Sequence, residues 1–183
     1  MKKSILLGLA LVFSIAACQQ KERYTQHSPE IDTFKKVIVA YENQDWDALA
    51  SHYADTAKIM YNKLEKNGMT KAQLLAMHKQ DAEAFNSWEF VNGESEYEMV
   101  VTDKGETWVN FWGIWKGDFK PTQKTYTIPA HYTARFVNGK IVKEFGYWDL
   151  SELMLDFQKI QAEQKLKNEE TAITETQNSD NEL

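Results

Sequence analysis

The sequence predicts one α+β domain in which N-terminal helices pack on one face of a strongly curved antiparallel sheet. Apolar residues recur at helical spacing up to about Trp88, and one short strand interrupts that region. The spacing then changes to a period of two and keeps it for about sixty residues. Helices followed by a meander of strands are typical of α+β domains, because each apolar face needs another element to cover it.

The first eighteen residues predict export and a lipid anchor. Met1-Lys2-Lys3 precede an apolar stretch over residues 5–16, which is the layout of a secretory signal peptide. This stretch is too short to span a bilayer, which takes about 20 apolar residues. Residues 15–18, "IAAC", resemble the lipobox of bacterial lipoproteins, in which cleavage precedes the cysteine and its thiol is lipidated. The alternative is an ordinary signal peptide followed by an incidental free thiol at Cys18.

The lipobox resemblance divides the N-terminal region into a signal peptide over residues 1–17 and a lipidated cysteine with its tether over residues 18–28. Cys18 is the sole cysteine, so it has no internal disulfide partner. Gln19 after the cysteine resembles the sorting pattern for the outer membrane, and "QQKE" resembles surface-export signals of some Bacteroidetes lipoproteins. We therefore expect a protein of the bacterial cell envelope, lipid-anchored in the outer membrane on its periplasmic or surface side.

Charge and motif content exclude several classes of partner. Removing residues 1–17 moves the net charge from −6 to −8, and such a surface repels nucleic acid and anionic lipid headgroups. The sequence has no Cys/His cluster and no Gly-rich phosphate loop, so we expect no metal and no cofactor. Residues 161–183 are polar and acidic, which predicts a disordered, solvated tail.

Three helices are predicted before the sheet. Ser28 and Pro29 form the N-cap and first position of a helix whose apolar residues repeat every three to four positions. Asp45 caps a shorter second helix. Thr70, with a glutamine three residues later, has the capping-box spacing, and the third helix runs from there to about residue 87.

The predicted strands follow from alternation and turn residues. Gly105 ends an Asp-Lys-Gly turn, and Asn138-Gly139 is a strong hairpin signal. Asp149 begins a sequence that fits a capping box for a last helix. The expected strands cover residues 57–61, 90–102, 107–116, 125–137 and 141–148.

Two stretches carry a family resemblance. Residues 41–59, "YENQDWDALASHYADTAKI", and 134–149, "ARFVNGKIVKEFGYWD", resemble signature stretches of the SnoaL-like branch of the NTF2-like superfamily. The resemblance implies an NTF2-like cone over residues 29–160, with a pocket between helices and sheet and a homodimer formed through the outer face. This scaffold hosts isomerases, cyclases, dehydratases and plain binding modules, so it does not settle the activity.

The third helix offers the candidate catalytic pair His78 and Asp81. The two residues lie three apart, on or beside the apolar stripe formed by Leu74, Met77 and Phe85. Residues at this spacing are neighbours on a helix, so the carboxylate could orient the imidazole as a general base. The alternative is a satisfied boundary pair with a structural role.

Candidate ligand-binding residues come from the strands. In the strand over residues 107–116 both faces are apolar, which predicts that the helices cover one face and a partner subunit covers the other. In the strand over residues 125–137, alternation places His131 on the outer face, unless Pro129 marks a bulge that turns it inward. The candidates are Tyr61, Asn110, Trp108, Trp112, His131 and Tyr147.

Comparison with the ketosteroid isomerase argues against that particular chemistry. That enzyme carries a carboxylate base on the short first strand, where this sequence has Tyr61, and a tyrosine on the first helix, near Val37 here. Three readings remain open. The first is a lipid-anchored module that binds a small, largely apolar molecule, and the second is an isomerase, cyclase or dehydratase that uses His78 and Asp81. The third is a structural dimer whose cavity is closed by side chains.

We expect Cys18→Ser to release the protein from the membrane fraction or to leave it unprocessed, because the thiol that would carry the lipid is gone. Fractionation of cells, followed by a high-salt wash of the membranes, measures the outcome. Quantitative retention of the mutant in washed membranes would contradict the anchor.

Overall fold

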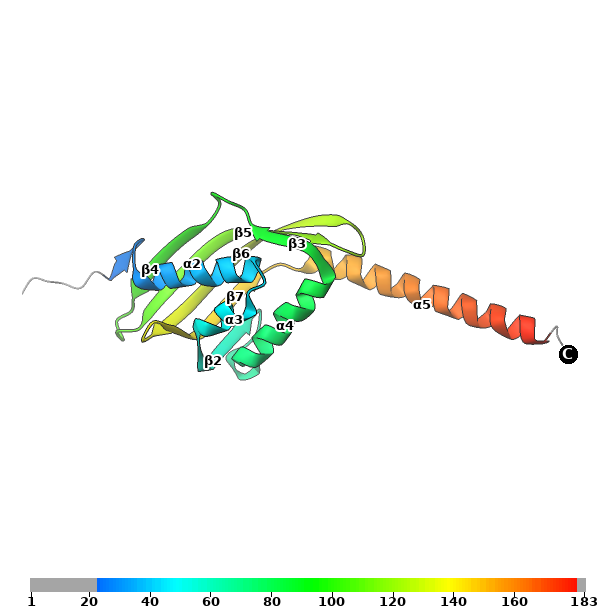
Figure 1. Cartoon of the computed structure of the whole chain (residues 1–183), viewed down its shortest axis with the longest axis horizontal. Coiled ribbons are helices and arrows are strands. Elements are labelled where there is room, and N and C mark those ends of the chain that lie inside the picture. The colour runs from blue at the N-terminus through cyan, green and yellow to red at the C-terminus, as the bar shows by residue number, and fades with distance from the viewer. Residues whose placement is uncertain (1–22, 181–183) are drawn as a thin grey trace, which may run out of the picture.

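A computed structural model describes residues 23–180, with side chains to residue 171, so the predicted signal peptide and Cys18 lie outside the described residues. A seven-stranded sheet runs in the order β1-β4-β5-β6-β7-β2, with β3 paired to β5 beyond β4. Three helices, α2, α3 and α4, lie on one face of this curved sheet, and a long helix, α5, extends away from it (Figure 1). The predicted α+β class is confirmed.

The three predicted helices begin where their caps place them. α2 (Pro29–Glu42) starts after Ser28, whose hydroxyl accepts a hydrogen bond from the amide of Ile31 at 3.2 Å. α3 (Trp46–Ser51) starts after Asp45, whose side chain accepts from the amide of Ala48. α4 (Lys71–Ala84) starts with a complete capping box at Thr70. Local side-chain chemistry therefore fixes the start of each helix.

The end of α4 differs from the prediction. The helix stops at Ala84, and β3 (Phe85–Phe90) begins at once in extended backbone. β3 is held from α2, because the Glu42 carboxylate accepts a hydrogen bond from the Phe90 amide at 2.7 Å and the Tyr41 carbonyl accepts from the Trp88 indole at 3.3 Å. These long-range bonds override the local helical pattern.

The prediction of a single strand over residues 90–102 is wrong, because this region contains the end of one strand and the whole of another. A turn containing Gly93, whose φ of 82° suits glycine, separates β3 from β4 (Glu96–Val101). Both strands pair with the same edge of β5 (Thr107–Phe119), which is longer than predicted. One long strand therefore serves two short neighbours, and the break between them lets the sheet curve.

The strand predicted over residues 57–61 is also longer than predicted. β2 (Tyr53–Tyr61) pairs with β7 (Lys140–Trp148) in parallel, so the sheet is mixed rather than wholly antiparallel. The remaining pairs along the path are antiparallel, and β6 (Lys124–Val137) joins β7 through the predicted Asn138-Gly139 turn, in which both residues have positive φ.

The first described residues are tied to the sheet. β1 (Tyr24–Thr25) pairs with β4, and the Arg23 guanidinium lies 2.6 Å from the Asp103 carboxylate. The predicted tether therefore includes a short strand. A 3₁₀ turn, η1 (Glu65–Asn67), follows β2.

The C-terminal segment contains a long helix. α5 (Ser151–Asp180) covers most of the predicted tail, and its side chains beyond residue 160 are exposed as far as residue 171. Lys165 and Glu169 lie one helical turn apart at 3.9 Å, and such pairs, together with good helix formers, favour a solvated helix. The predicted tail over residues 161–183 therefore lies mostly within α5, and its described side chains are exposed.

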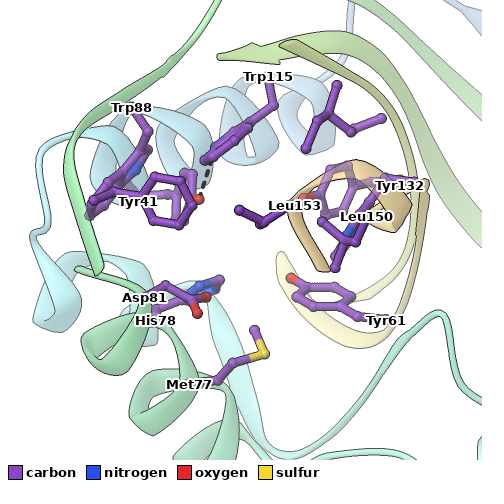
Figure 2. A pocket seen from close by; sticks show the side chains of 14 residues that line it. Tyr41, Tyr61, Met77, His78, Asp81, Trp88, Trp115, Tyr132, Leu150 and Leu153 are labelled. Carbon is purple, nitrogen blue, oxygen red and sulfur yellow. Dashed lines mark hydrogen bonds between the residues drawn. The ribbon is translucent and has the colours of Figure 1, made fainter. Parts of the chain in front are cut away.

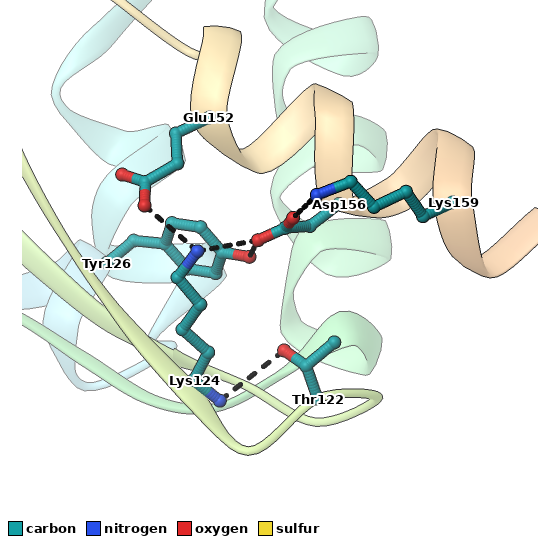
Figure 3. Close-up of polar contacts among 6 residues, drawn as sticks. All are labelled: Thr122, Lys124, Tyr126, Glu152, Asp156 and Lys159. Atoms are coloured by element: carbon teal, nitrogen blue, oxygen red, sulfur yellow. Dashed lines mark hydrogen bonds and ion pairs between the residues drawn. The ribbon is translucent and has the colours of Figure 1, made fainter.

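A polar cluster docks the start of α5 on the sheet (Figure 3). The Lys124 ammonium contacts Glu152 at 2.9 Å and Asp156 at 2.6 Å, and Asp156 also accepts the Tyr126 hydroxyl at 2.8 Å. Lys159, one turn further along the helix, adds a contact to Asp156 at 3.0 Å. These partners hold the pKa of Asp156 far below its usual range, so the carboxylate stays charged.

No helix among the described residues is long and apolar enough to cross a membrane.

Candidate functional site

A pocket of about 210 Å³ lies between the helices and the inner face of the sheet (Figure 2). Its wall is mostly aromatic, with a histidine, a carboxylate and three tyrosines at intervals. Such an apolar cavity with a few polar groups is the usual form of a small-molecule site. The lining residues are Tyr41, Tyr61, Met77, His78, Asp81, Phe85, Trp88, Trp115, Ile128, Ala130, Tyr132, Trp148, Leu150 and Leu153.

Each wall comes from a different element. α4 supplies Met77, His78 and Asp81, as helical spacing predicts. Leu150, just before α5, and Leu153, in its first turn, close the pocket next to the segment that Lys124 docks. The pocket therefore depends on the first turn of α5.

His78 is buried among rings and is electrically neutral. Its imidazole stacks on Trp46 at 6.0 Å and lies 5.0 Å from the Tyr41 ring, measured between centroids. Burial lowers the pKa of His78 to about 4, because the low-polarity surroundings disfavour its charged form. Its Nδ1 atom is buried without a hydrogen-bond partner. At neutral pH this imidazole is therefore a weak base with one unused nitrogen.

Asp81 lies at the mouth of the pocket. Asp81 is exposed at the surface, yet the apolar walls on its inner side desolvate the carboxyl group and raise its pKa to about 6. The described side chains of Asp81 and His78 do not form the expected hydrogen bond. His78 Nδ1 has no partner, and desolvation alone accounts for the raised pKa of Asp81. The hypothesis that Asp81 orients and charges His78 is corrected accordingly. Of the two groups, Asp81 is the stronger base at neutral pH.

The tyrosines of the pocket are proton donors rather than bases. Burial raises the pKa of Tyr41, Tyr61 and Tyr132 well above the ordinary value, so their hydroxyls keep their protons. The Tyr41 hydroxyl accepts a hydrogen bond from the Trp115 indole at 3.1 Å (Figure 2), which leaves its own proton free to donate.

A buried carboxyl group, which the sequence analysis missed, lies behind this wall. Glu144 is 1% exposed, and it accepts the Tyr53 hydroxyl at 2.7 Å and the Tyr61 hydroxyl at 2.6 Å. Burial raises the pKa of Glu144 to about 7 even though both tyrosine bonds lower it. The available signal was its position in β7, where alternation puts Glu144 on the inner face with Gly146 and Trp148.

Gly146 allows this arrangement. A Cβ atom at this position would lie 2.8 Å from the Tyr61 ring and 2.4 Å from the Trp148 ring, closer than real contacts allow. The two rings therefore pack edge to face, 5.0 Å apart between centroids, over bare backbone. We conclude that the glycine sets the position of Tyr61 in the pocket wall.

Only one of the six candidate ligand-binding residues, Tyr61, lines the pocket. The other five lie on the outer face, because the pairing of β5 with β6 has no bulge at Pro129 and the alternation is not reset. His131 therefore points outward, as expected without a bulge. Asn110 lies between Glu98 and Thr133 across the strands and is separated from His78 by the sheet. The five are Trp108, Asn110, Trp112, His131 and Tyr147.

The outer-face rings form a continuous aromatic row. Trp112 lies 4.9 Å from His131, which stacks on Tyr147 at 6.3 Å, and Tyr147 stacks on Phe145 at 6.4 Å. Phe145 in turn stacks on Trp108 at 6.2 Å. Trp112 and Tyr147 remain 39% and 50% exposed, so this apolar face is uncovered in the single chain.

The described residues contain no cluster of three or more His, Cys, Asp and Glu side chains that could hold a metal ion.

Comparison with known proteins agrees with this architecture. The family model of the SnoaL-like polyketide cyclases matches residues 32–157. The chain belongs to this family. Among curated proteins, none matches this SnoaL-like chain.

Several solved structures share the fold. A proposed polyketide cyclase from Xanthomonas campestris has a TM-score of 0.57 and 14% identity, with 70% of this chain and 96% of that chain covered. A SnoaL-like protein from Shewanella denitrificans gives 0.55 and 15%, with 73% and 99% covered. A ketosteroid isomerase-like protein from Catenulispora acidiphila, in complex with trimethylamine, gives 0.54 and 13%, with 66% and 87% covered. At these identities the likeness confirms the NTF2-like fold alone.

Proposed function

We propose that this SnoaL-like domain binds a small, largely apolar molecule in the pocket, and that Cys18 anchors it by lipid to the bacterial cell envelope. One observation carries the binding proposal: an aromatic cavity of about 210 Å³ has the Tyr41 hydroxyl, whose proton is free, and the neutral His78 imidazole in its wall. Unpaired polar atoms at an apolar cavity cost free energy, which a ligand with a complementary group recovers. The family supports a ring-bearing molecule of the polyketide kind.

A second function, catalysis by proton transfer, is favoured by Asp81. A carboxylate whose pKa approaches the working pH is suited to remove a proton from carbon, and tyrosine hydroxyls can stabilise the oxyanion that forms. Tyr41 supplies a neutral donor on the same pocket, whereas the Tyr61 hydroxyl donates its proton to Glu144. In this reading Asp81 is the base that removes a proton next to a carbonyl, and His78 contacts the ligand as a neutral group.

The binding proposal predicts that His78→Gln weakens binding of 2-acetylnaphthalene, an apolar ketone, by roughly 3- to 10-fold, the worth of one hydrogen bond. The midpoint of thermal unfolding should change little, because glutamine keeps hydrogen-bonding capacity. Calorimetry and thermal unfolding of the unlipidated protein measure both quantities. Lys79→Gln, an exposed neighbour on α4, is the control and should bind as the wild type does. A mutant that melts far lower, with unchanged affinity at matched stability, would make His78 structural.

The catalytic reading predicts that the protein accelerates exchange of the acetyl protons of 2-acetylnaphthalene with D₂O, which NMR follows directly. Asp81→Asn should abolish the acceleration while leaving the ketone bound, because asparagine cannot accept the proton. Glu83→Gln on the same helix serves as the control. Exchange no faster than buffer in the wild type would leave the pocket as a binding module.

We also infer a homodimer formed through the aromatic row of the outer face. Monomeric proteins rarely leave a large contiguous apolar patch uncovered, and the same face of two copies can be covered mutually by two-fold symmetry. The row is made of Trp108, Trp112, His131, Phe145 and Tyr147.

Trp112→Glu should convert the dimer into monomers, since two charges would be buried against apolar rings. Sedimentation of the unlipidated protein at tens of micromolar measures the change. Val39→Glu, which alters a more exposed apolar residue on α2, is the control and should leave the dimer intact. A wild type that sediments as a monomer would overturn the proposal.

A further inference from the structure

The buried Glu144 carboxyl group is linked to the pocket through a hydrogen bond to Tyr61. Both of its oxygen atoms are occupied, one by the Tyr53 hydroxyl and the other by the Tyr61 hydroxyl. Tyr61 lines the main pocket, and Figure 2 shows its hydroxyl turned toward the interior, whereas Tyr53 is not part of that wall. A single tyrosine therefore touches both the buried carboxyl group and the space that a ligand would occupy.

A small void lies beside this carboxyl group. Its volume is about 20 Å³, enough for one water molecule. Its wall includes Glu144, Tyr61 and His78, whose Nδ1 atom is buried without a partner. Polar groups thus converge on the region behind Tyr61, and no lysine or arginine is among the residues that line this void.

The number of protons in the cluster decides what Tyr61 can donate. While Glu144 is a carboxylate, it has no proton and accepts both tyrosine protons, so the Tyr61 proton is already used. When Glu144 is protonated, its own O–H can donate to the Tyr61 oxygen. The Tyr61 proton is then free to turn toward the pocket, and the bond from Glu144 polarises it.

We propose that Glu144 is a positioning residue that makes Tyr61 a hydrogen-bond donor to the ligand only while Glu144 holds a proton. The ligand class that uses such a donor is an apolar molecule with a carbonyl or enolate oxygen. This inference rests on the proposed binding function and specifies which chemical group the pocket recognises.

The direction of the pH dependence follows from the surroundings of Glu144. Burial raises its pKa to about 7, so the protonated form, and with it the donor, is present below about pH 7 and is lost as the pH rises through that value. The groups that face it are Tyr53 and Tyr61 from β2, Tyr132 from β6, Tyr41 from α2 and His78 from α4. The tyrosines stay neutral, and His78, whose pKa is about 4, also stays neutral across this range. Asp81, at the mouth of the pocket, has a pKa of about 6, so its titration would overlap that of Glu144. The binding test therefore uses protein in which Asp81 is replaced by Asn.

The test compares two ligands of the same shape. 2-Acetylnaphthalene has a carbonyl oxygen, and 2-isopropenylnaphthalene has a methylene group in its place. The measured quantity is the ratio of their dissociation constants for unlipidated protein carrying Asp81→Asn, from about pH 5.5 to about pH 8.5. We expect the ketone to be favoured roughly 3- to 10-fold at the acid end, as one hydrogen bond provides, with the advantage disappearing around pH 7.

We call the control of the Tyr61 proton by Glu144 the relay. Three further variants separate this relay from general effects of pH on binding. Glu144→Gln has no titratable proton, so the ratio should become independent of pH. Tyr61→Phe should bring the ratio close to one at every pH. Tyr53→Phe removes a donor to the carboxylate but leaves the pocket wall intact, so the ratio should persist at low pH and its midpoint should move to higher pH.

Two results would overturn the relay while leaving pocket binding in place. One is a wild-type ratio that does not vary with pH, and the other is an unchanged pH profile in Glu144→Gln. Failure of both ligands to bind any variant would overturn the binding function and the relay together.

Discussion

The pairing of β5 with β6 is the constraint on which the rest of the molecule depends. It is continuous from Thr107 opposite Phe136 to Phe119 opposite Lys124, with no bulge along its length. Because alternation is unbroken, every second residue of both strands faces the helices. At one end these inner residues form the main core with α2, and at the other they form a second cluster with β3 and α5. The pocket lies between the two clusters, where neither set of side chains fills the space.

Features with local causes could be read from the sequence, and those with long-range causes could not. Ser28, Asp45 and Thr70 cap their helices as expected, and the Asn138-Gly139 turn closes its hairpin, because each depends on neighbouring residues alone. The division of residues 85–101 into β3 and β4 depends on which edge of β5 is available, and the parallel β2–β7 pair depends on residues about ninety positions apart. Neither pairing leaves a periodic signal in its own segment.

The candidate site shows the same division. Helical spacing correctly brings His78 and Asp81 to the pocket, but spacing does not give their charge states. Those come from the aromatic wall, which makes His78 a weaker base and Asp81 a stronger one than the free side chains. The burial of Glu144 could not be predicted from the sequence, because an acid on a strand usually faces solvent. Its partners Tyr53 and Tyr61 also lie about ninety residues away in sequence.

The two faces of the sheet separate two physical tasks. The inner face combines apolar walls with titratable groups, so its chemistry depends on excluding water from Glu144 and His78. The outer face carries stacked rings that gain most when another apolar surface covers them. Residues on adjacent positions of one strand, such as Ala130 and His131, therefore face opposite sides of the sheet although they are bonded neighbours. A substitution that keeps the alternation alters one task alone, whereas a one-residue slip of β6 would exchange the two faces and destroy both.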